Sequence, residues 1–261
     1  MAHLFIFGLG YSARRIRAAA EARGWQVRAT GSAGELAFED GDSVRAALRT
    51  ASHMLSSVPP GETLDPVLER YGDALGHGWL GYLSSTGVYG DTGGAWVDET
   101  APAGRGRRSA RIEADQAWLV RGARVFRLPG IYGPGRSALD RVADGRAHRI
   151  DRPQQVFSRV HVDDIAAGVI AGLEAPAGAY NLADDLPASQ NAVIEEACRL
   201  LGREAPALQA FDEAGLSPQA RAFYAENRRV ANGKAKRVLG WRPAFPTYRD
   251  GLRAIVRPTS P

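Results

Sequence analysis

The stretch Leu4–Ala13, "LFIFGLGYSA", places a short apolar run directly before two glycines and the start of a helical pattern. Apolar residues then recur at helical spacing until Gly24, a residue type that commonly ends a helix. The residues that follow, Trp25–Thr30, alternate between apolar and polar as a second strand does. The order strand, glycine turn, helix, strand predicts the first unit of a parallel sheet.

The glycine turn has the pattern Gly-x-Gly-x-x-Ala, and each small residue in it has a mechanical purpose. Gly8 allows the tight turn, Gly10 lets a pyrophosphate approach the backbone, and Ala13 lets the helix pack close to the strand. Free N–H groups at the helix start would hold the phosphates. An ordinary strand-to-helix turn is the competing interpretation, but the flanking strands and helix favour a dinucleotide site. The dinucleotide contacts expected here are Gly8, Leu9, Gly10, Tyr11, Ser12 and Ala13.

The end of the second predicted strand bears on the choice between NAD and NADP. NAD sites commonly place Asp or Glu there to bind the ribose 2′-hydroxyl, but this chain has Thr30-Gly31-Ser32. Because no acid stands at this place, a 2′-phosphate would not be repelled. The nearby arginines are either solvated or available to attract the phosphate. We therefore expect NADP more than NAD, with Thr30 and Ser32 among its contacts. The nearby arginines are Arg14, Arg15 and Arg28.

Further strand candidates alternate with helical segments through the first half of the chain. The strands are expected at residues 53–58, 79–85 and 124–128, with a helix at about 64–75. This alternation predicts an α/β fold of the Rossmann type, a doubly wound parallel sheet with helices on both faces. Ligands of such sheets bind at the carboxyl ends of the strands. The further cofactor contacts expected there are Ser57, Val58, Pro59, Ser84, Pro129, Gly130 and Ile131.

Five further segments occur in an order that is typical of one family. They are "LSSTGVYGD" at 83–91, "RLPGIYGPGR" at 127–136, "RVHVDDIAAGV" at 159–169, "AYNLADD" at 179–185 and "GKAKRVLGWRPAF" at 233–245. With the glycine turn in front of them, the chain resembles the extended short-chain dehydrogenases/reductases (SDRs) of the NAD-dependent epimerase/dehydratase type.

The resemblance implies a domain division and a class of ligand. A Rossmann domain would comprise residues 1–130, to which 155–175 return, and a small α+β substrate subdomain would comprise 131–154 and 176–261. The substrate would be a small molecule, with a nucleotide sugar as one candidate. The substrate-facing residues would be Tyr132, Arg136 and Arg159.

The family's chemistry uses a Ser or Thr, a Tyr, and a Lys four residues after the Tyr. The resemblance places Ser85 at the Ser/Thr position, with Thr86 beside it. Counting back from Asp115, which matches an acid that commonly follows the Lys, puts Arg111 in the Lys position and Arg107 in the Tyr position. Arg111 could still bind ribose hydroxyls, but the guanidinium of Arg107 stays protonated and cannot act as a base. The chain is therefore expected to be an atypical member with altered or lost acid/base chemistry.

Other groups could carry a displaced acid/base function. Tyr89 and Tyr132 are phenols near strand ends, and His161 is the nearest imidazole, although each also fits a packing role. Two functions stay open: an NADP-dependent oxidoreductase or epimerase-like enzyme, or a dinucleotide-binding sensor or scaffold without hydride chemistry. The missing Tyr favours the second, whereas Ser85, Tyr89 and a substrate subdomain favour the first.

The charge pattern argues against nucleic acid as a partner. The stretch 105–111, "RGRRSAR", is rich in arginine, but the net charge is only +4, with 33 basic and 29 acidic residues. The arginines are interleaved with acids along the whole chain, so no continuous phosphate-binding surface is expected. A second basic group could contact phosphates of a substrate or a nucleic acid, but a solvated helix face is the favoured interpretation. The group comprises Arg228, Arg229, Lys234, Lys236 and Arg237.

Composition also bears on location and metal binding. The N-terminus lacks a basic start, and no apolar run reaches the roughly 20 residues of a membrane helix, so we expect a cytoplasmic protein without membrane contact. Cys198 is the single cysteine and is expected in the core. Five scattered histidines lack ligand spacing, so no metal site is expected. A homodimer is one candidate for the oligomeric state.

Overall fold

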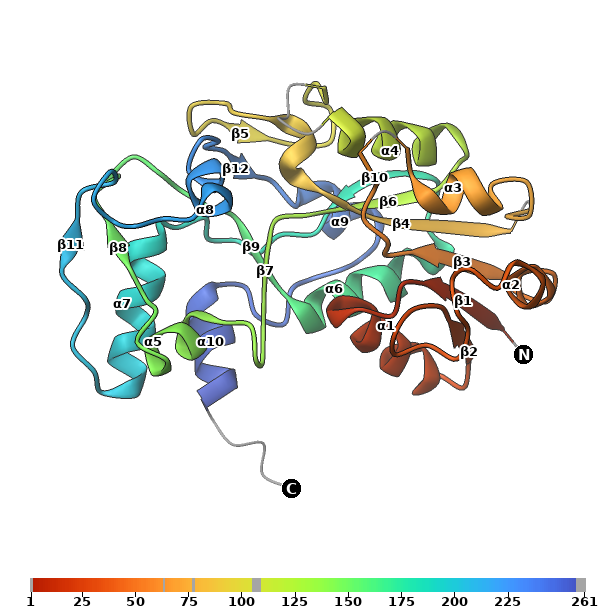
Figure 1. Cartoon of the computed structure of the whole chain (residues 1–261), viewed down its shortest axis with the longest axis horizontal. Helices are drawn as coiled ribbons and strands as arrows, with labels where there is room; N and C mark the ends of the chain where they lie inside the picture. The colour runs from red at the N-terminus through yellow and green to blue at the C-terminus, as the bar shows by residue number, and fades with distance from the viewer. Residues whose placement is uncertain (1, 63, 77, 105–108, 257–261) are drawn as a thin grey trace.

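The computed structural model describes residues 2–62, 64–76, 78–104 and 109–256. Its centre is a six-stranded sheet in the order β10-β6-β4-β3-β1-β2, and every neighbouring pair is parallel (Figure 1). The strands are β1 (His3–Phe7), β2 (Gln26–Ala29), β3 (His53–Ser56), β4 (Trp79–Ser85), β6 (Arg124–Leu128) and β10 (Gly178–Asn181). This sheet confirms the predicted Rossmann-type class, and the strand order reverses direction between β1 and β3, where ligands of such sheets bind.

Both faces of the sheet are covered by helices, as the alternation of elements predicted. Successive strand residues point to opposite faces, so Leu4 and Ile6 enter one core while Phe5 and Phe7 enter the other. Helices α1 (Tyr11–Glu21) and α6 (Val162–Ala171) cover the first face. Helices α2 (Gly41–Leu48), α3 (Pro66–Tyr71) and α4 (Ser109–Val120) cover the second (Figure 1).

A smaller unit lies to one side of the sheet (Figure 1). Helices α5 (Ala138–Ala143), α7 (Gln190–Leu201) and α10 (Tyr248–Val256) enclose a core of their own. Cys198 is buried in this core with a free thiol, as predicted. The short strands β8 (Arg149–Ile150) and β11 (Leu208–Gln209) pair at its edge.

Short elements connect the sheet with the smaller unit. Strands β7 (Gly130–Tyr132) and β9 (Arg159–His161) form one parallel pair, and β5 (Trp96–Val97) and β12 (Arg229–Val230) form another. The remaining helices are α8 (Pro218–Phe223), α9 (Gly233–Val238) and the 3₁₀ turns η1 (Thr86–Tyr89) and η2 (Gly172–Glu174). Within the described ranges, no helix has the length and apolar character needed to cross a membrane.

The position of β10 corrects the expected domain division. We assigned residues 176–261 to the substrate subdomain, but β10 pairs with β6 along its whole length and completes the central sheet. Ala235 and Trp241 also pack into the core on the α1–α6 face of the sheet. The assignment was wrong for these segments because the outer edge of β6 needs a covering strand, and the chain supplies it only after α6.

Candidate functional site

The glycine turn is held by the ends of two neighbouring strands. The N–H of Gly8 donates to Oγ1 of Thr30 at 3.1 Å, and its carbonyl oxygen accepts from Oγ of Ser57 at 2.9 Å. The N–H of Leu9 donates to the carbonyl oxygen of Thr30 at 2.8 Å. Gly8 has a φ of +81°, and a Cβ there would lie 3.0 Å from the side chain of Val58. Both the left-handed conformation and the contact require glycine at this place.

Helix α1 begins in front of open space. Gly10 precedes its first residue and provides no side-chain cap, and a Cβ built on Gly10 would meet no atom within 4 Å. The first N–H groups of α1 therefore face a place that an anion can occupy, and the helix dipole favours a negative charge there. This arrangement fits a dinucleotide pyrophosphate.

A cavity of about 550 Å³, here called cavity 1, extends from the start of α1 to the carboxyl ends of β4 and β6. The structure brings most of the residues predicted from the sequence together on its wall. They are Gly10, Tyr11, Ser12, Ser57, Pro59, Ser84, Ser85, Thr86, Arg111, Pro129, Gly130, Ile131 and Arg136.

Several expected cofactor contacts do not belong to this wall. The hydroxyl and carbonyl oxygens of Thr30 are engaged by the glycine turn, and Thr30 is buried. Ala13 packs in the core between α1 and the sheet. These residues shape the turn from behind instead of facing the cavity. Four further expected contacts also lie outside this wall: Gly8, Leu9, Ser32 and Val58.

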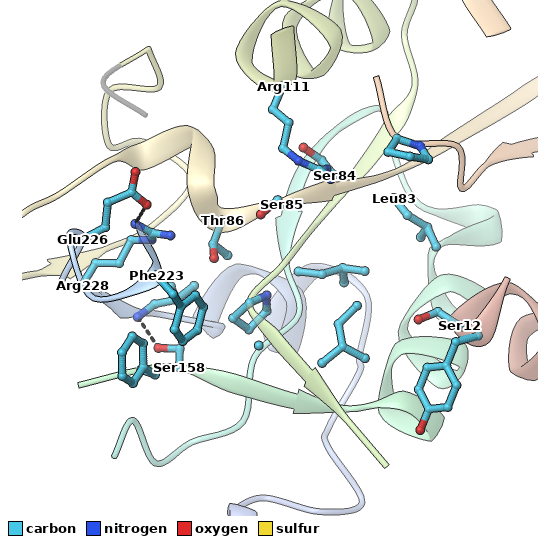
Figure 2. A pocket seen from close by; sticks show the side chains of 18 of the residues that line it. Ser12, Leu83, Ser84, Ser85, Thr86, Arg111, Ser158, Phe223, Glu226 and Arg228 are labelled. Carbon is cyan, nitrogen blue, oxygen red and sulfur yellow. Dashed lines mark hydrogen bonds and ion pairs between the residues drawn. The ribbon is translucent and has the colours of Figure 1, made fainter. Parts of the chain in front are cut away.

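The end of β4 and the first residue of η1 contribute three hydroxyl groups to cavity 1 (Figure 2). Ser84 donates through Oγ to Oδ2 of Asp115 at 2.6 Å. Oγ of Ser85 accepts from the N–H of Gly87 at 3.1 Å and so caps η1. The hydroxyl of Ser85 donates no hydrogen bond to any described residue, so it can donate one to a ligand. Thr86 lies beside it and is buried.

Arg111 reaches from α4 toward Ser84 and Ser85 (Figure 2). It is half-buried and has no hydrogen-bond or ion-pair partner among the described residues. Its guanidinium is therefore available to a ligand in cavity 1. Arg107 lies outside the described residues, so its place as the substitute for the family's Tyr stays a prediction.

A buried ion pair lies directly behind this end of cavity 1, and the sequence reasoning missed it. Arg127 donates through Nη2 to Oδ1 of Asp115 at 2.7 Å and through Nε to Oδ2 at 3.1 Å. The side chains are only 4% and 0% exposed. A signal was present, because Arg127 is a charge near the end of the apolar strand run 124–128, and buried charges need partners. The pair ties α4, which carries Arg111, to β6.

Tyr89 belongs to the same buried network and does not line cavity 1. Its hydroxyl accepts from Nη1 of Arg127 at 3.0 Å and donates to Oδ1 of Asn181 at 2.8 Å. Burial raises the pKa of Tyr89, although the charge of Arg127 partly opposes this. Tyr89 was a candidate for the displaced acid/base group, but the structure engages its phenol with two buried side chains.

The opposite wall of cavity 1 comes from segments that the sequence reasoning did not assign to a site. It includes Ser158, Phe223 and Arg228 (Figure 2). Arg228 donates to Oε2 of Glu226 at 2.7 Å and to the carbonyl oxygen of Gly90 at 2.8 Å. The expected solvated basic face was therefore wrong for Arg228, because its guanidinium is bonded on the inner side of the β12 segment.

The end of β2 carries an acid that the sequence reasoning overlooked. Glu35 folds back onto the strand, where it accepts from the N–H of Ala29 at 3.0 Å and pairs with Arg17. Burial would raise the pKa of Glu35, but the hydrogen bonds from Ala29 and Arg17 outweigh it and the pKa is lowered. Arg15 pairs with Asp163 at 3.5 Å.

The remaining predicted residues lie farther from the glycine turn. Tyr132 and Arg159 line a second cavity beside cavity 1. His161 lines neither cavity: its Nδ1 accepts from the N–H of Asp163 at 3.3 Å and caps α6. Burial lowers the pKa of His161, so the neutral form is favoured. These contacts agree with a packing and capping role.

Sequence comparison identifies curated relatives, while no protein-family model matches the chain. The 3-diazoavenalumate denitrifying reductase of Streptomyces sp is 32% identical over 140 residues. The match covers 49% of this chain and 45% of that reductase, so it spans less than half of the relative's length. Protein YeeZ of Escherichia coli (strain K12) is 29% identical over 246 residues, which cover 79% of this chain and 86% of YeeZ.

Solved structures extend the comparison to the whole chain. The human epimerase family protein SDR39U1, in complex with NADPH, has a TM-score of 0.77 at 18% identity and covers 97% of this chain and 99% of its own. The UDP-glucose 4-epimerase of Thermus thermophilus, in complex with NAD, has a TM-score of 0.75 at 19% identity, with 97% of each chain covered. These likenesses show the fold.

A third structure is more similar in sequence. A conserved protein of unknown function from Silicibacter pomeroyi DSS is 39% identical, has a TM-score of 0.87, and is covered over 98% of each chain. The resemblance predicted from the six motifs is thus confirmed at the level of the fold. The chain belongs to the same family as the Silicibacter pomeroyi protein, a family with the extended SDR fold of NAD-dependent epimerases and dehydratases.

Proposed function

We propose that the chain binds NAD(P) in cavity 1 and resembles the nucleoside-diphosphate-sugar epimerases, dehydratases and reductases, with altered or lost acid/base chemistry. One observation carries this proposal. Cavity 1 begins at the open start of α1, where N–H groups can bind phosphate, and ends at the hydroxyl of Ser85 and the guanidinium of Arg111. One ligand can therefore contact both ends. The dinucleotides bound by SDR39U1 and the Thermus thermophilus epimerase support it.

The residues of cavity 1 fit the parts of the cofactor. The N–H groups at the start of α1 would hold the pyrophosphate, Arg111 the nicotinamide ribose, and the segment Pro129–Ile131 the nicotinamide. A bound nicotinamide dinucleotide would supply or accept a hydride. Ser57 and Pro59, which follow the end of β3, would contact the dinucleotide and help to fix its position in cavity 1.

We propose NADP in preference to NAD. Arg14 and Arg28 are exposed and have no ion-pair partner among the described residues, so either can meet a 2′-phosphate. The carboxylate of Glu35 lies beside β2, but it is engaged by Arg17 and the N–H of Ala29. Both oxygens of Glu35 already have a partner, which makes Glu35 a poorer ligand for a ribose 2′-hydroxyl than the unengaged acid of an NAD site.

The chemistry available at the far end of cavity 1 is limited. Ser85 can donate a hydrogen bond to a substrate oxygen, and Arg111 can stabilise negative charge that develops on it. Neither group can accept a proton near neutral pH. Since general acid/base help is typically worth about 10²–10⁴-fold in rate, low turnover of ordinary family substrates is expected. A sensor or scaffold that binds the dinucleotide without hydride transfer is the second candidate.

The substrate would lie between cavity 1 and the smaller unit. Arg136 lines cavity 1, and Tyr132 and Arg159 line the adjacent cavity, so all three predicted substrate residues lie along one path. UDP-glucose and UDP-glucuronic acid, bound by structural neighbours of 15–17% identity, make a nucleotide sugar one candidate.

The substitution Gly10→Asp tests cofactor binding while sparing the fold. The backbone of Gly10 is extended, its Cβ position is open, and Asp is a preferred residue before a helix, so the variant should fold. Its carboxylate would repel the pyrophosphate and occupy the N–H groups that hold it. Wild-type protein at about 100-fold excess of NADP⁺ over Kd should gain about 2.7 kcal/mol of stability, visible as a thermal shift. The variant should show no shift.

A matched control is Gly41→Asp, which adds the same charge at the start of α2, where a Cβ also meets no atom within 4 Å. It should keep the full shift with NADP⁺. The proposal fails if neither NADP⁺ nor NAD⁺ shifts the wild type. A larger shift with NAD⁺ than with NADP⁺ removes the preference for NADP but keeps the site.

A further inference from the structure

A second cavity, here called cavity 2, adjoins cavity 1 on the side of the smaller unit. It measures about 470 Å³ and shares Gly130, Ile131, Arg136, Phe157 and Phe223 with cavity 1. The two cavities meet at these residues. A ligand whose reacting end lies at Ser85 can therefore extend its other end into cavity 2.

The interior of cavity 2 is rich in aromatic rings. Phe223 stacks on Phe157 with ring centroids 4.4 Å apart and planes at 12°, and Tyr224 meets Phe157 edge-on at 5.4 Å. Phe223 is still 48% exposed, so one part of its ring is not covered by the protein. Aromatic and aliphatic walls of this kind favour a planar, apolar body. The other apolar members of the wall include Ile131, Tyr132, Ile150, Val193, Ile194, Leu216, Tyr248 and Leu252.

The charges of cavity 2 have one sign. Arg136 and Arg141 are exposed at the cavity and have no ion-pair partner among the described residues. Arg159 lies deeper and is buried. Among the described residues that line cavity 2 there is no Asp or Glu. The resulting positive potential favours an anionic ligand.

Four arginines supply most of the hydrogen-bond donors of cavity 2, and the side chains that can also accept are those of Ser137, His148, Gln190 and three tyrosines. Arginine has no acceptor, and the Oε1 of Gln190 already accepts from Arg159 at 3.1 Å. The hydroxyl of Ser137 is bonded to Asp140 at 2.6 Å. Ribose and sugar hydroxyls need acceptors for their protons, whereas an ionised carboxylate has no proton to donate and needs only donors. The wall is therefore better matched to a carboxylate than to a polyol.

We propose that cavity 2 binds the non-reacting end of the substrate, and that this end is a planar, apolar carboxylate of the aryl-substituted acid class and not a nucleoside diphosphate. The proposed function is needed only to place the reacting end in cavity 1. Arg141 and Arg136 hold the carboxylate at the rim, and the Phe157–Phe223 pair stacks against the apolar body.

Calorimetric titration of cinnamate, and separately of UDP, tests this assignment with and without saturating NADP⁺. Cinnamate should bind and UDP should not. Arg141→Glu reverses a charge that lines cavity 2 but not cavity 1, so cinnamate should bind at least about tenfold more weakly while NADP⁺ binding is unchanged. Arg49→Glu makes the same change at an exposed arginine outside both cavities and should leave cinnamate binding unaltered.

A second variant examines the apolar body separately from the charge. Phe223→Ala removes the half-exposed ring stacked on Phe157 and should weaken cinnamate several-fold. Trp96→Ala removes an exposed ring outside both cavities, at 60% exposure, and should have no effect.

Three results would overturn the assignment: no cinnamate binding up to about 10 mM, cinnamate binding that is indifferent to both cavity variants, or UDP binding that Arg141→Glu abolishes. The last would identify cavity 2 as a nucleotide site. If cinnamate binds with the expected dependence on Arg141 and Phe223 while NADP⁺ does not bind at all, the proposed function fails and the assignment of cavity 2 stands.

Discussion

The two ends of cavity 1 are built in different ways. The end at the glycine turn is formed by Gly10 and the backbone at the start of α1, and the turn that leads to it is held by hydroxyls of Thr30 and Ser57. The end at Ser85 depends on side chains from β4, α4, β6 and η1 that a buried ion pair holds together. A backbone site tolerates few changes of residue type, whereas a side-chain site can exchange its chemistry while the fold is kept.

The largest loss of stability is expected at the buried Asp115–Arg127 pair behind the Ser85 end of cavity 1. Asp115→Ala leaves the guanidinium of Arg127 buried without its carboxylate, which typically costs about 3–5 kcal/mol of unfolding free energy. Urea denaturation measures the loss. The variant should also bind NADP⁺ more weakly, because Asp115 positions the helix that carries Arg111, one turn earlier.

The control for Asp115→Ala is Asp73→Ala, which breaks the exposed pair with Arg45. Surface pairs contribute little, so stability should stay nearly unchanged. Equal losses in the two variants would show that the buried pair does not hold this end of the cavity, and the contrast between the two ends would lose its basis.

An intermediate effect is expected at Tyr89. Tyr89→Phe removes a hydroxyl that bonds Arg127 and Asn181, and leaving such buried groups without a partner costs about 1–3 kcal/mol. NADP⁺ affinity should be retained, because Tyr89 does not line cavity 1. Turnover on any substrate found should survive as well. Unchanged stability together with abolished turnover would instead make Tyr89 the displaced acid/base group.

The smallest effect is expected at the turn end, from Glu35→Gln. The folded pKa of Glu35 lies below its unfolded value, so its contribution to stability is present above about pH 5 and is lost as pH falls through the folded value. The pair with Arg17 is partly exposed, so the loss at pH 7 should stay below about 1 kcal/mol. Thermal unfolding from pH 3 to 8 checks this. A difference that grows toward acid pH would contradict the assignment.

Local pattern predicted the parts of the molecule that depend on neighbouring residues. The turn at Gly8 and Gly10, α1, and the strands β1, β2, β3, β4 and β6 follow from apolar periodicity and glycine geometry over short distances. These features also predicted most of the wall of cavity 1, because parallel strands end at the same edge.

The features that sequence reasoning missed join side chains to partners on other elements or across a loop. Asp115 meets Arg127 across two elements, Glu35 returns to the strand before it, and Arg228 crosses to Gly90. Periodicity carries no information on which distant side chain satisfies a buried charge. Only the charge of Arg127 within an apolar strand pointed to a partner, and it did not say which one.

The late arrival of β10 has a consequence for synthesis on the ribosome. Strand β6 ends at Leu128, but the strand that covers its outer edge begins at Gly178, 50 residues later. At translation rates of about 5–20 residues per second, the nascent chain carries an unpaired apolar edge for about 3–10 seconds. Such an edge can pair with another chain, so slowing elongation between these strands should raise the share of newly made protein that aggregates or is held by chaperones.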